Sequence, residues 1–259
     1  MQILQAISGA GVVYELARHD AGLWWWALSL LVYYVTGCLG LTVTMHRALT
    51  HRAFVLKRPL EIVLTLAGAV GGSGSSIAWT AMHRAHHAYV DTARDPHSPA
   101  KLGWALVASV YDYDFDPRHA KDLLRDPFHV FVHRYYTLLL LLWGVSLAAI
   151  DVRLCVFGFL VPAFAQITIS NLTSLLTHSQ GYRNFETRDE SANNALIAVL
   201  AFGEGWHNNH HAAPTHWSFQ RRWWEIDLGA IAIGALFALG VAAPADSNGA
   251  RLKAAETVA

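Results

Sequence analysis

The chain has 259 residues, of which 54% are apolar and only 15% are charged, against a usual charged share of about 25%. Nineteen basic residues balance nineteen acidic ones, so charge gives no reason to expect a nucleic-acid partner. The apolar content excludes disorder, and the two cysteines, Cys38 and Cys155, lie in apolar runs that predict no disulfide scaffold. Ten Trp and nine Tyr favour membrane interfaces. The composition indicates a folded membrane protein.

Near the start, residues 3–17 form an apolar stretch too short for an ordinary span. We expect an interfacial helix or a vestigial first span there, and no secretory signal peptide, because the basic segment and the cleavage pattern are missing. Residues 23–45 contain no Asp, Glu, Lys or Arg. At about 1.5 Å per residue they are long enough to cross a hydrocarbon core of about 30 Å.

Two further uncharged stretches, 135–150 and 154–177, are separated only by Asp151-Val152-Arg153. This spacing predicts a helical hairpin that turns at a membrane surface. The first stretch is short, so we expect that span to begin near residue 131. Hydropathy does not decide whether residues 60–79, rich in Gly and Ser, or residues 228–243 also cross.

The 15 histidines are concentrated in tight groups. Two groups have the pattern HxxHH, which places three imidazoles on one face of a helix and is expected only about 0.05 times by chance in such a chain. The pair His46 and His51 differs, because on an ideal helix their rings are about 140° apart. Those two rings therefore reach a site from different angles, or the helix ends between them. The grouped histidines and the isolated one near them are His46, His51, His83, His86, His87, His178, His207, His210 and His211.

Burying so many imidazoles is costly unless a metal uses their lone pairs. Imidazole suits Zn, Cu, Fe and Ni, but nine histidines exceed the four ligands of one structural zinc. The number favours a two-iron centre for oxygen chemistry. An isolated histidine such as His178 is more often a hydrogen-bonded core residue. The histidines expected to be solvated or interfacial are His19, His119, His129, His133 and His216.

The strings HRALTHR, HRAHH and GEGWHNNHH, in this order, resemble the three histidine boxes of integral-membrane fatty acyl desaturases of the stearoyl-CoA desaturase type. The flanking strings Asp95-Pro96-His97 and Trp223-Trp224-Glu225-Ile226-Asp227 agree, and the similarity runs over residues 30–228. The resemblance implies that all nine histidines bind two Fe²⁺ ions. It also implies that the protein uses O₂ and external electrons to place a cis double bond in a saturated acyl chain, held in a bent channel.

Two departures from that family matter. Ser174 stands where the family usually has an Asn that contacts one iron through water, and a serine can also hold a water. Ala81 and Met82 replace an Arg-Asp pair that contacts the CoA head group in animal acyl-CoA enzymes. The second departure favours an acyl-lipid or carrier-bound substrate over acyl-CoA.

The first two boxes must share one metal pair, so residues 60–79 are not expected to make a single crossing. We predict an all-α fold: a transmembrane bundle of three spans (23–45, 131–150 and 154–177), or four if residues 3–17 cross. A helical cap (46–130 and 178–245) completes a single domain over 1–259 and holds the site. Basic residues on the box side favour a cytoplasmic cap, in a bacterial inner membrane: Arg47, Arg52, Lys57, Arg58, Arg84 and Arg118.

Carboxylates are expected to orient the imidazole rings, the candidates being Asp91, Asp95, Glu186, Asp189 and Glu204. Trp79, Tyr89 and Trp206 are candidate lining residues of the acyl channel. No HPGG haem-attachment string occurs, so a separate donor, a ferredoxin or a small cytochrome with its reductase, is expected to supply electrons. Two alternatives remain: a membrane di-iron hydroxylase, and a non-enzymatic metal-binding or transport protein.

Overall fold

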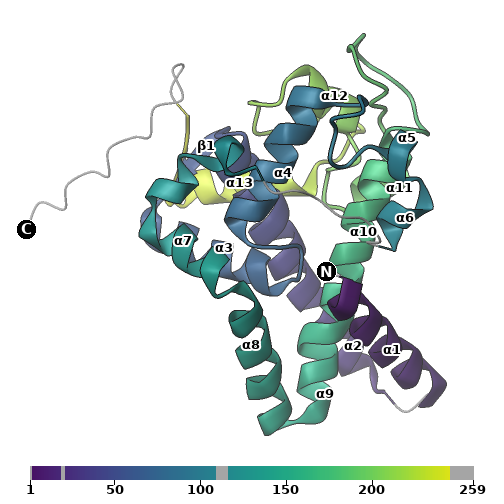
Figure 1. Cartoon of the computed structure of the whole chain (residues 1–259), viewed down its shortest axis with the longest axis vertical. Coiled ribbons are helices and arrows are strands. Elements are labelled where there is room, and N and C mark those ends of the chain that lie inside the picture. The colour runs from purple at the N-terminus through teal and green to yellow at the C-terminus, as the bar shows by residue number, and fades with distance from the viewer. Residues whose placement is uncertain (1, 19–20, 109–115, 246–259) are drawn as a thin grey trace, which may run out of the picture.

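The computed structural model describes residues 2–18, 21–108 and 116–245. Long helices form a bundle in the lower part of Figure 1, and shorter helices and loops form a cap above it. The all-α prediction is confirmed, apart from one antiparallel pair of three-residue strands. The elements are α1 (Gln2–Arg18), α2 (Leu23–Tyr33), η1 (Tyr34–Thr50), β1 (Phe54–Leu56), α3 (Arg58–Val70), α4 (Ser76–Tyr89), α5 (Pro99–Leu102), α6 (Trp104–Val107), η2 (Pro117–Ala120), η3 (Leu123–Arg125), α7 (Pro127–Arg134), α8 (Tyr136–Ile150), α9 (Val152–Cys155), η4 (Val156–Leu160), α10 (Val161–Thr177), α11 (Ala195–Leu200), α12 (His207–Ala212), α13 (Leu228–Ala238) and β2 (Ala242–Pro244).

The first span is a continuous helix over Leu23–Thr50, longer than the predicted 23–45. Its second half, η1, winds as a π-helix, with the i→i+5 bond of that geometry from the His51 N–H to the His46 carbonyl (3.1 Å). In this winding residue i+5 lies close to residue i, so the rings of His46 and His51 are only 4.8 Å apart. The helix ends at Thr50, between the two histidines, as one of the two expected explanations had it, and His51 is its C-cap residue.

The predicted hairpin turn is present at Asp151, whose carboxylate accepts a hydrogen bond from the Arg153 N–H at 2.7 Å. The returning helix over Val152–Thr177 is long and apolar enough to cross a membrane. The preceding span is not straight, which corrects the prediction for 131–150. Its first residues belong to α7, which meets α8 at 69°. The break is at Tyr135, whose backbone (φ −107°, ψ 17°) departs from α-helical geometry and ends α7. None of the 15 residues of α8 is buried, as expected of a helix that faces lipid.

Residues 60–79 do not form one crossing helix, as predicted. The chain turns after Val70, and Ser75 caps the start of α4 by accepting from the Ala78 N–H at 3.2 Å. The preceding helix, α3, packs closely against η1. A Cβ on Gly40 would lie only 2.3 Å from the Gly68 nitrogen, so this contact requires glycine.

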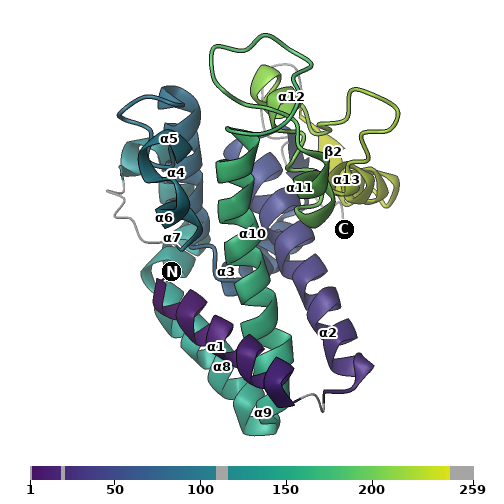
Figure 2. The same ribbon diagram turned by 90° about the vertical axis from the view of Figure 1, so that its right-hand side faces the viewer.

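The N-terminal helix α1 lies beside α10 and η4 (Figure 2). Its Gln5 side chain donates to Thr168 Oγ1 of α10 at 3.1 Å. At 17 residues it is shorter than the two clear spans. The C-terminal helix α13 has 11 residues, too few to cross a bilayer, and packs on η1 through Ala232 and Ile233.

Candidate metal centre

The cap brings all nine predicted histidines together from η1, α4, α12 and the end of α10. They form two adjoining groups, which meet where His87, His210 and His211 approach one another. The His46 group consists of His46, His51, His83, His87 and His210, and the His86 group consists of His86, His178, His207 and His211.

Within each group the Nε2 atoms approach one another closely. The Nε2 atom of His87 lies 3.0 Å from those of His83 and His210. In the other group, His207 Nε2 lies 3.1 Å from His178 Nε2 and 3.0 Å from His211 Nε2. Adjacent ligands of one ion with metal–imidazole bonds of about 2.0–2.1 Å are separated by about 3 Å, so the spacing is that of a metal site.

In four of these rings a carboxylate contacts Nδ1, the ring nitrogen on the side away from the converging Nε2 atoms. His46 Nδ1 lies 2.6 Å from Glu204 Oε2, and His86 Nδ1 lies 3.0 Å from both Asp95 oxygens. The two remaining pairs are His178 Nδ1 with Asp91 (3.2 Å) and His211 Nδ1 with Asp189 (3.0 Å). Four of the five predicted orienting carboxylates therefore contact a ring, whereas Glu186 is exposed.

The charge states determine where the protons lie. Burial alone would raise the pKa of Asp95, but the hydrogen bond from His86, the charge of His86 and the backbone hydrogen bonds from His97 and Asp91 together lower it. The pKa of Glu204 is also lowered, because the charges of His46 and Arg47 outweigh burial. Ionised carboxylates only accept hydrogen bonds, so each paired Nδ1 is the donor and each Nε2 of a neutral ring keeps its lone pair.

The rings without such a partner are held neutral by their surroundings. Burial, and then the neighbouring histidines, lowers the pKa of His51, His83, His87, His207 and His210 well below the usual value. The His51 Nε2 atom is buried with no hydrogen-bond partner among the described residues. Neutral imidazoles whose lone pairs converge without donors fit a divalent metal ion of the type that nitrogen ligands favour.

A buried ion pair outside the two groups fixes the first box, and sequence reasoning did not predict it. Arg47 is fully buried and donates to both oxygens of Asp227 (2.8 and 3.0 Å) and to Glu204 (3.3 Å). Arg47 is therefore not one of the surface cations that indicate membrane orientation. The usable signal was the acidic string after the third box, where Glu225 similarly accepts from Asn209 Nδ2 at 2.9 Å.

The other histidines fall into several environments. His216 is exposed, as predicted, and His119 and His133 are half-buried. His129 was expected to be solvated or interfacial but is fully buried, because Ser76 and Glu61 enclose it. His19 lies outside the described residues.

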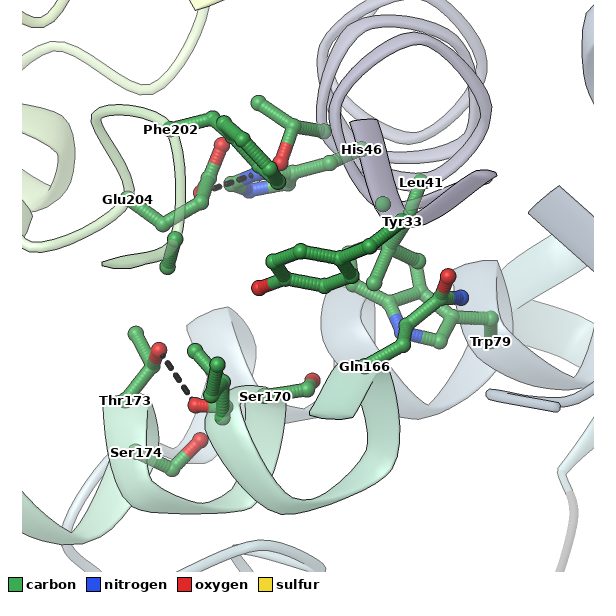
Figure 3. Close-up of a pocket in the computed structure, with 14 residues that line it drawn as sticks. Tyr33, Leu41, His46, Trp79, Gln166, Ser170, Thr173, Ser174, Phe202 and Glu204 are labelled. Atoms are coloured by element: carbon green, nitrogen blue, oxygen red, sulfur yellow. Dashed lines mark hydrogen bonds and ion pairs between the residues drawn. The ribbon is translucent and has the colours of Figure 1, made fainter. Parts of the chain in front are cut away.

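A cavity of about 70 Å³ adjoins the His46 group between η1, α10 and the segment after α11. Figure 3 shows Tyr33 extending across it toward Ser174 and Thr173 of α10, with His46 and Glu204 at one side. Ser174 lines this cavity and is half-buried. Of the predicted lining residues, Trp79 lines both this cavity and a smaller neighbouring one that also contains Met82.

The other two aromatic candidates are occupied elsewhere. Trp206 is buried and donates from Nε1 to the Ile226 carbonyl at 2.9 Å. The ring of Tyr89 lies under the Arg94 guanidinium, 3.8 Å from its centroid. Neither residue is among those that line the two cavities.

The bundle and the histidine groups define a membrane protein with a histidine-rich metal centre beside an apolar cavity. The family model described as fatty acid desaturase matches residues 23–234, and the chain belongs to this family.

Proteins similar to this chain are named for different substrates. The chain is 36% identical over 222 residues to the sn-1 stearoyl-lipid 9-desaturase of Anabaena variabilis, covering 83% of this chain and 81% of the relative. It is 33% identical to the protein of the same name from Synechocystis, covering 83% and 70%. It is also 36% identical to an acyl-CoA 5-desaturase of Anemone leveillei, covering 83% and 70%. The chain is thus a fatty acyl desaturase, while identity alone does not choose the head group.

Proposed function

We propose that this protein uses two iron ions, held by its nine histidines, and O₂ to place a cis double bond in the acyl chain of a membrane lipid or a carrier-bound fatty acid. The observation that carries the proposal is the shared position of His46. It belongs to one histidine group and also lines the cavity next to it. A substrate chain in that cavity lies beside the metal centre.

The iron supplies the oxidising chemistry when bound, and the protein supplies ligation and positioning. Asp91, Asp95, Asp189 and Glu204 keep the Nδ1 protons of their histidines in place, so that each Nε2 lone pair points inward. Ser174 lines the cavity one turn before His178, which supports its proposed role of holding a water near the His86 group. The apolar wall of the cavity, including Leu41 and Phe202, excludes bulk water.

The preference for a lipid or carrier head group rests on the two positions before His83. Met82 lines the smaller cavity, where it offers an apolar surface to a substrate. Ala81 is fully buried and packs with Leu49, Ile77, Ala120 and Leu123. Neither residue offers a charge to a nucleotide. The name of the Anabaena relative, a stearoyl-lipid desaturase, supports the same head group.

A separate protein, a ferredoxin or a small cytochrome, is the proposed electron donor. The cap is proposed to face the cytoplasm of a bacterial cell, with the spans in the inner membrane. Single-cysteine variants at Thr215, which is exposed in the cap, and at Asp151, which is exposed at the hairpin turn, check this orientation in intact cells. Reagent that does not cross the membrane is expected to label position 151 and to spare position 215. The reverse pattern contradicts the orientation.

The activity is tested by expression in a host that lacks the corresponding unsaturation, followed by mass spectrometry of each lipid class. We expect new double bonds in glycerolipid acyl chains and at least two irons per purified chain. His207→Ala should abolish the desaturation and lower the iron content. His216→Ala is the matched control, because His216 is exposed and lies outside both groups. Hydroxylated chains in place of unsaturated ones, or activity retained by His207→Ala, refutes the proposal.

In a reconstituted assay, the same fatty acid is offered as lipid, carrier and CoA esters at equal concentration. We expect faster desaturation of the lipid or carrier form. Faster turnover of the CoA ester than of both others contradicts the head-group proposal and leaves the desaturase assignment intact.

A further inference from the structure

A second polar cluster lies where α3, α4 and α7 begin. Glu61 stands in the first turn of α3, Asp126 caps α7, and His129 lies in the first turn of α7. His129 is fully buried, and Glu61 is 9% exposed. One ligand atom from each of the three lies within 4.8 Å of the others.

The free nitrogen of His129 faces the two carboxylates. His129 Nδ1 pairs with Ser76 Oγ at 2.9 Å, whereas Nε2 is buried without a hydrogen-bond partner among the described residues. Nε2 lies 3.5 Å from Glu61 Oε1 and 3.9 Å from Asp126 Oδ2. Both distances exceed a hydrogen bond, but they are close to the separation of about 3.3 Å between ligands in a tetrahedral site with bonds of 2.0–2.1 Å.

The cluster also adjoins solvent on one side and a cavity on the other. Arg58 donates to Glu61 Oε1 and to Asp126 Oδ1, and Asp126 Oδ2 is the oxygen nearest to His129. Arg58 is 39% exposed on its side chain, so its guanidinium can withdraw into solvent. Glu61 in addition lines a cavity of about 200 Å³, which supplies an entry path.

We propose that Glu61, Asp126 and His129 form a separate site for a divalent cation with the preferences of Zn²⁺, distinct from the histidine-rich centre. One histidine and two carboxylates, with water as a fourth ligand, are a chemically suitable set for this ion. The ion holds together the first turns of α3 and α7, and it reaches α4 through the His129–Ser76 contact. The start of α4 lies about 15 Å along that helix from His86. The site thus holds the far end of the helix that carries the second histidine box.

The test is the zinc content of full-length protein in detergent after equilibration with Zn²⁺ and removal of the excess. We expect wild-type protein to hold one more zinc per chain than His129→Asn or Glu61→Gln. Asparagine keeps a polar atom near the Nδ1 position for Ser76 and removes the ligand atom, and Glu61→Gln conserves side-chain size.

His133→Asn is the matched control, because His133 lies one turn further along α7 and pairs in the same way with Ser75 at 2.7 Å. This variant should keep the wild-type zinc content. Equal zinc in wild-type protein, His129→Asn and Glu61→Gln overturns the proposal. Since the readout is a difference between variants, it does not depend on how many ions the nine histidines bind.

Discussion

Replacing Asp95 by Asn tests the role of the orienting carboxylates most sharply. Asp95 is 1% exposed, and its two oxygens accept from His86 Nδ1 and from the backbone N–H groups of Asp91 and His97 (2.9–3.0 Å). Asparagine has the same shape, but it loses the charge and places an N–H₂ where an oxygen accepted. Removing such a partner of a ligand typically costs 10–100-fold in metal affinity, or about 1.4–2.8 kcal/mol.

The loss should be confined to the His86 group, because Asp95 contacts only that group's rings among the nine histidines. Chelator competition, followed by metal analysis at each chelator concentration, measures the affinity of each ion. We expect one ion to be lost at 10–100-fold lower chelator concentration in Asp95→Asn, and the other to be retained as in wild type. Asp116→Asn is the control, since the ion pair of Asp116 among the described residues is a local one, with Arg118 at 2.8 Å. If Asp95→Asn retains both ions with wild-type affinity, the carboxylates do not orient the ligands as described.

Two further substitutions test the surroundings of the site. Asp227→Ala leaves Arg47 fully buried without its principal partner, which should lower the free energy of unfolding by about 3–5 kcal/mol. An unchanged midpoint of thermal unfolding in detergent contradicts this prediction. Tyr33 crosses the cavity and donates to the Leu200 carbonyl at 2.8 Å, so Tyr33→Ala should favour longer acyl chains by about fourfold for each added methylene accommodated. Tyr33→Phe should keep the wild-type chain-length profile in product analysis. If Tyr33→Ala also has the wild-type profile, the cavity that Tyr33 crosses does not hold the acyl chain.

The sequence was sufficient to predict features that rest on local spacing. The HxxHH pattern needs only an ordinary helix to place three rings on one face, and His83, His86 and His87 lie that way on α4. The turn at Asp151 follows from a polar interruption between two apolar runs. The orienting carboxylates could be proposed because acidic residues near the boxes are few.

Other features depend on contacts between distant segments, and local patterns do not encode them. His129 is buried because Ser76 and Glu61, 53 and 68 residues away along the chain, enclose it. The buried state of Arg47 depends on Asp227, 180 residues away. The bend between α7 and α8 was missed, although the polar pair His133-Arg134 directly precedes it. Hydropathy records how apolar a segment is and says nothing of its direction.

The π-winding of η1 limits how the first histidine box can be transplanted. The string HRALTH grafted onto an ordinary α-helical scaffold would leave its two rings about 140° apart around the axis. In this protein the i→i+5 backbone brings them to 4.8 Å. A designer who wishes to copy this half of the centre must therefore copy the backbone of residues 34–50 along with the two histidines, or change their spacing to four residues.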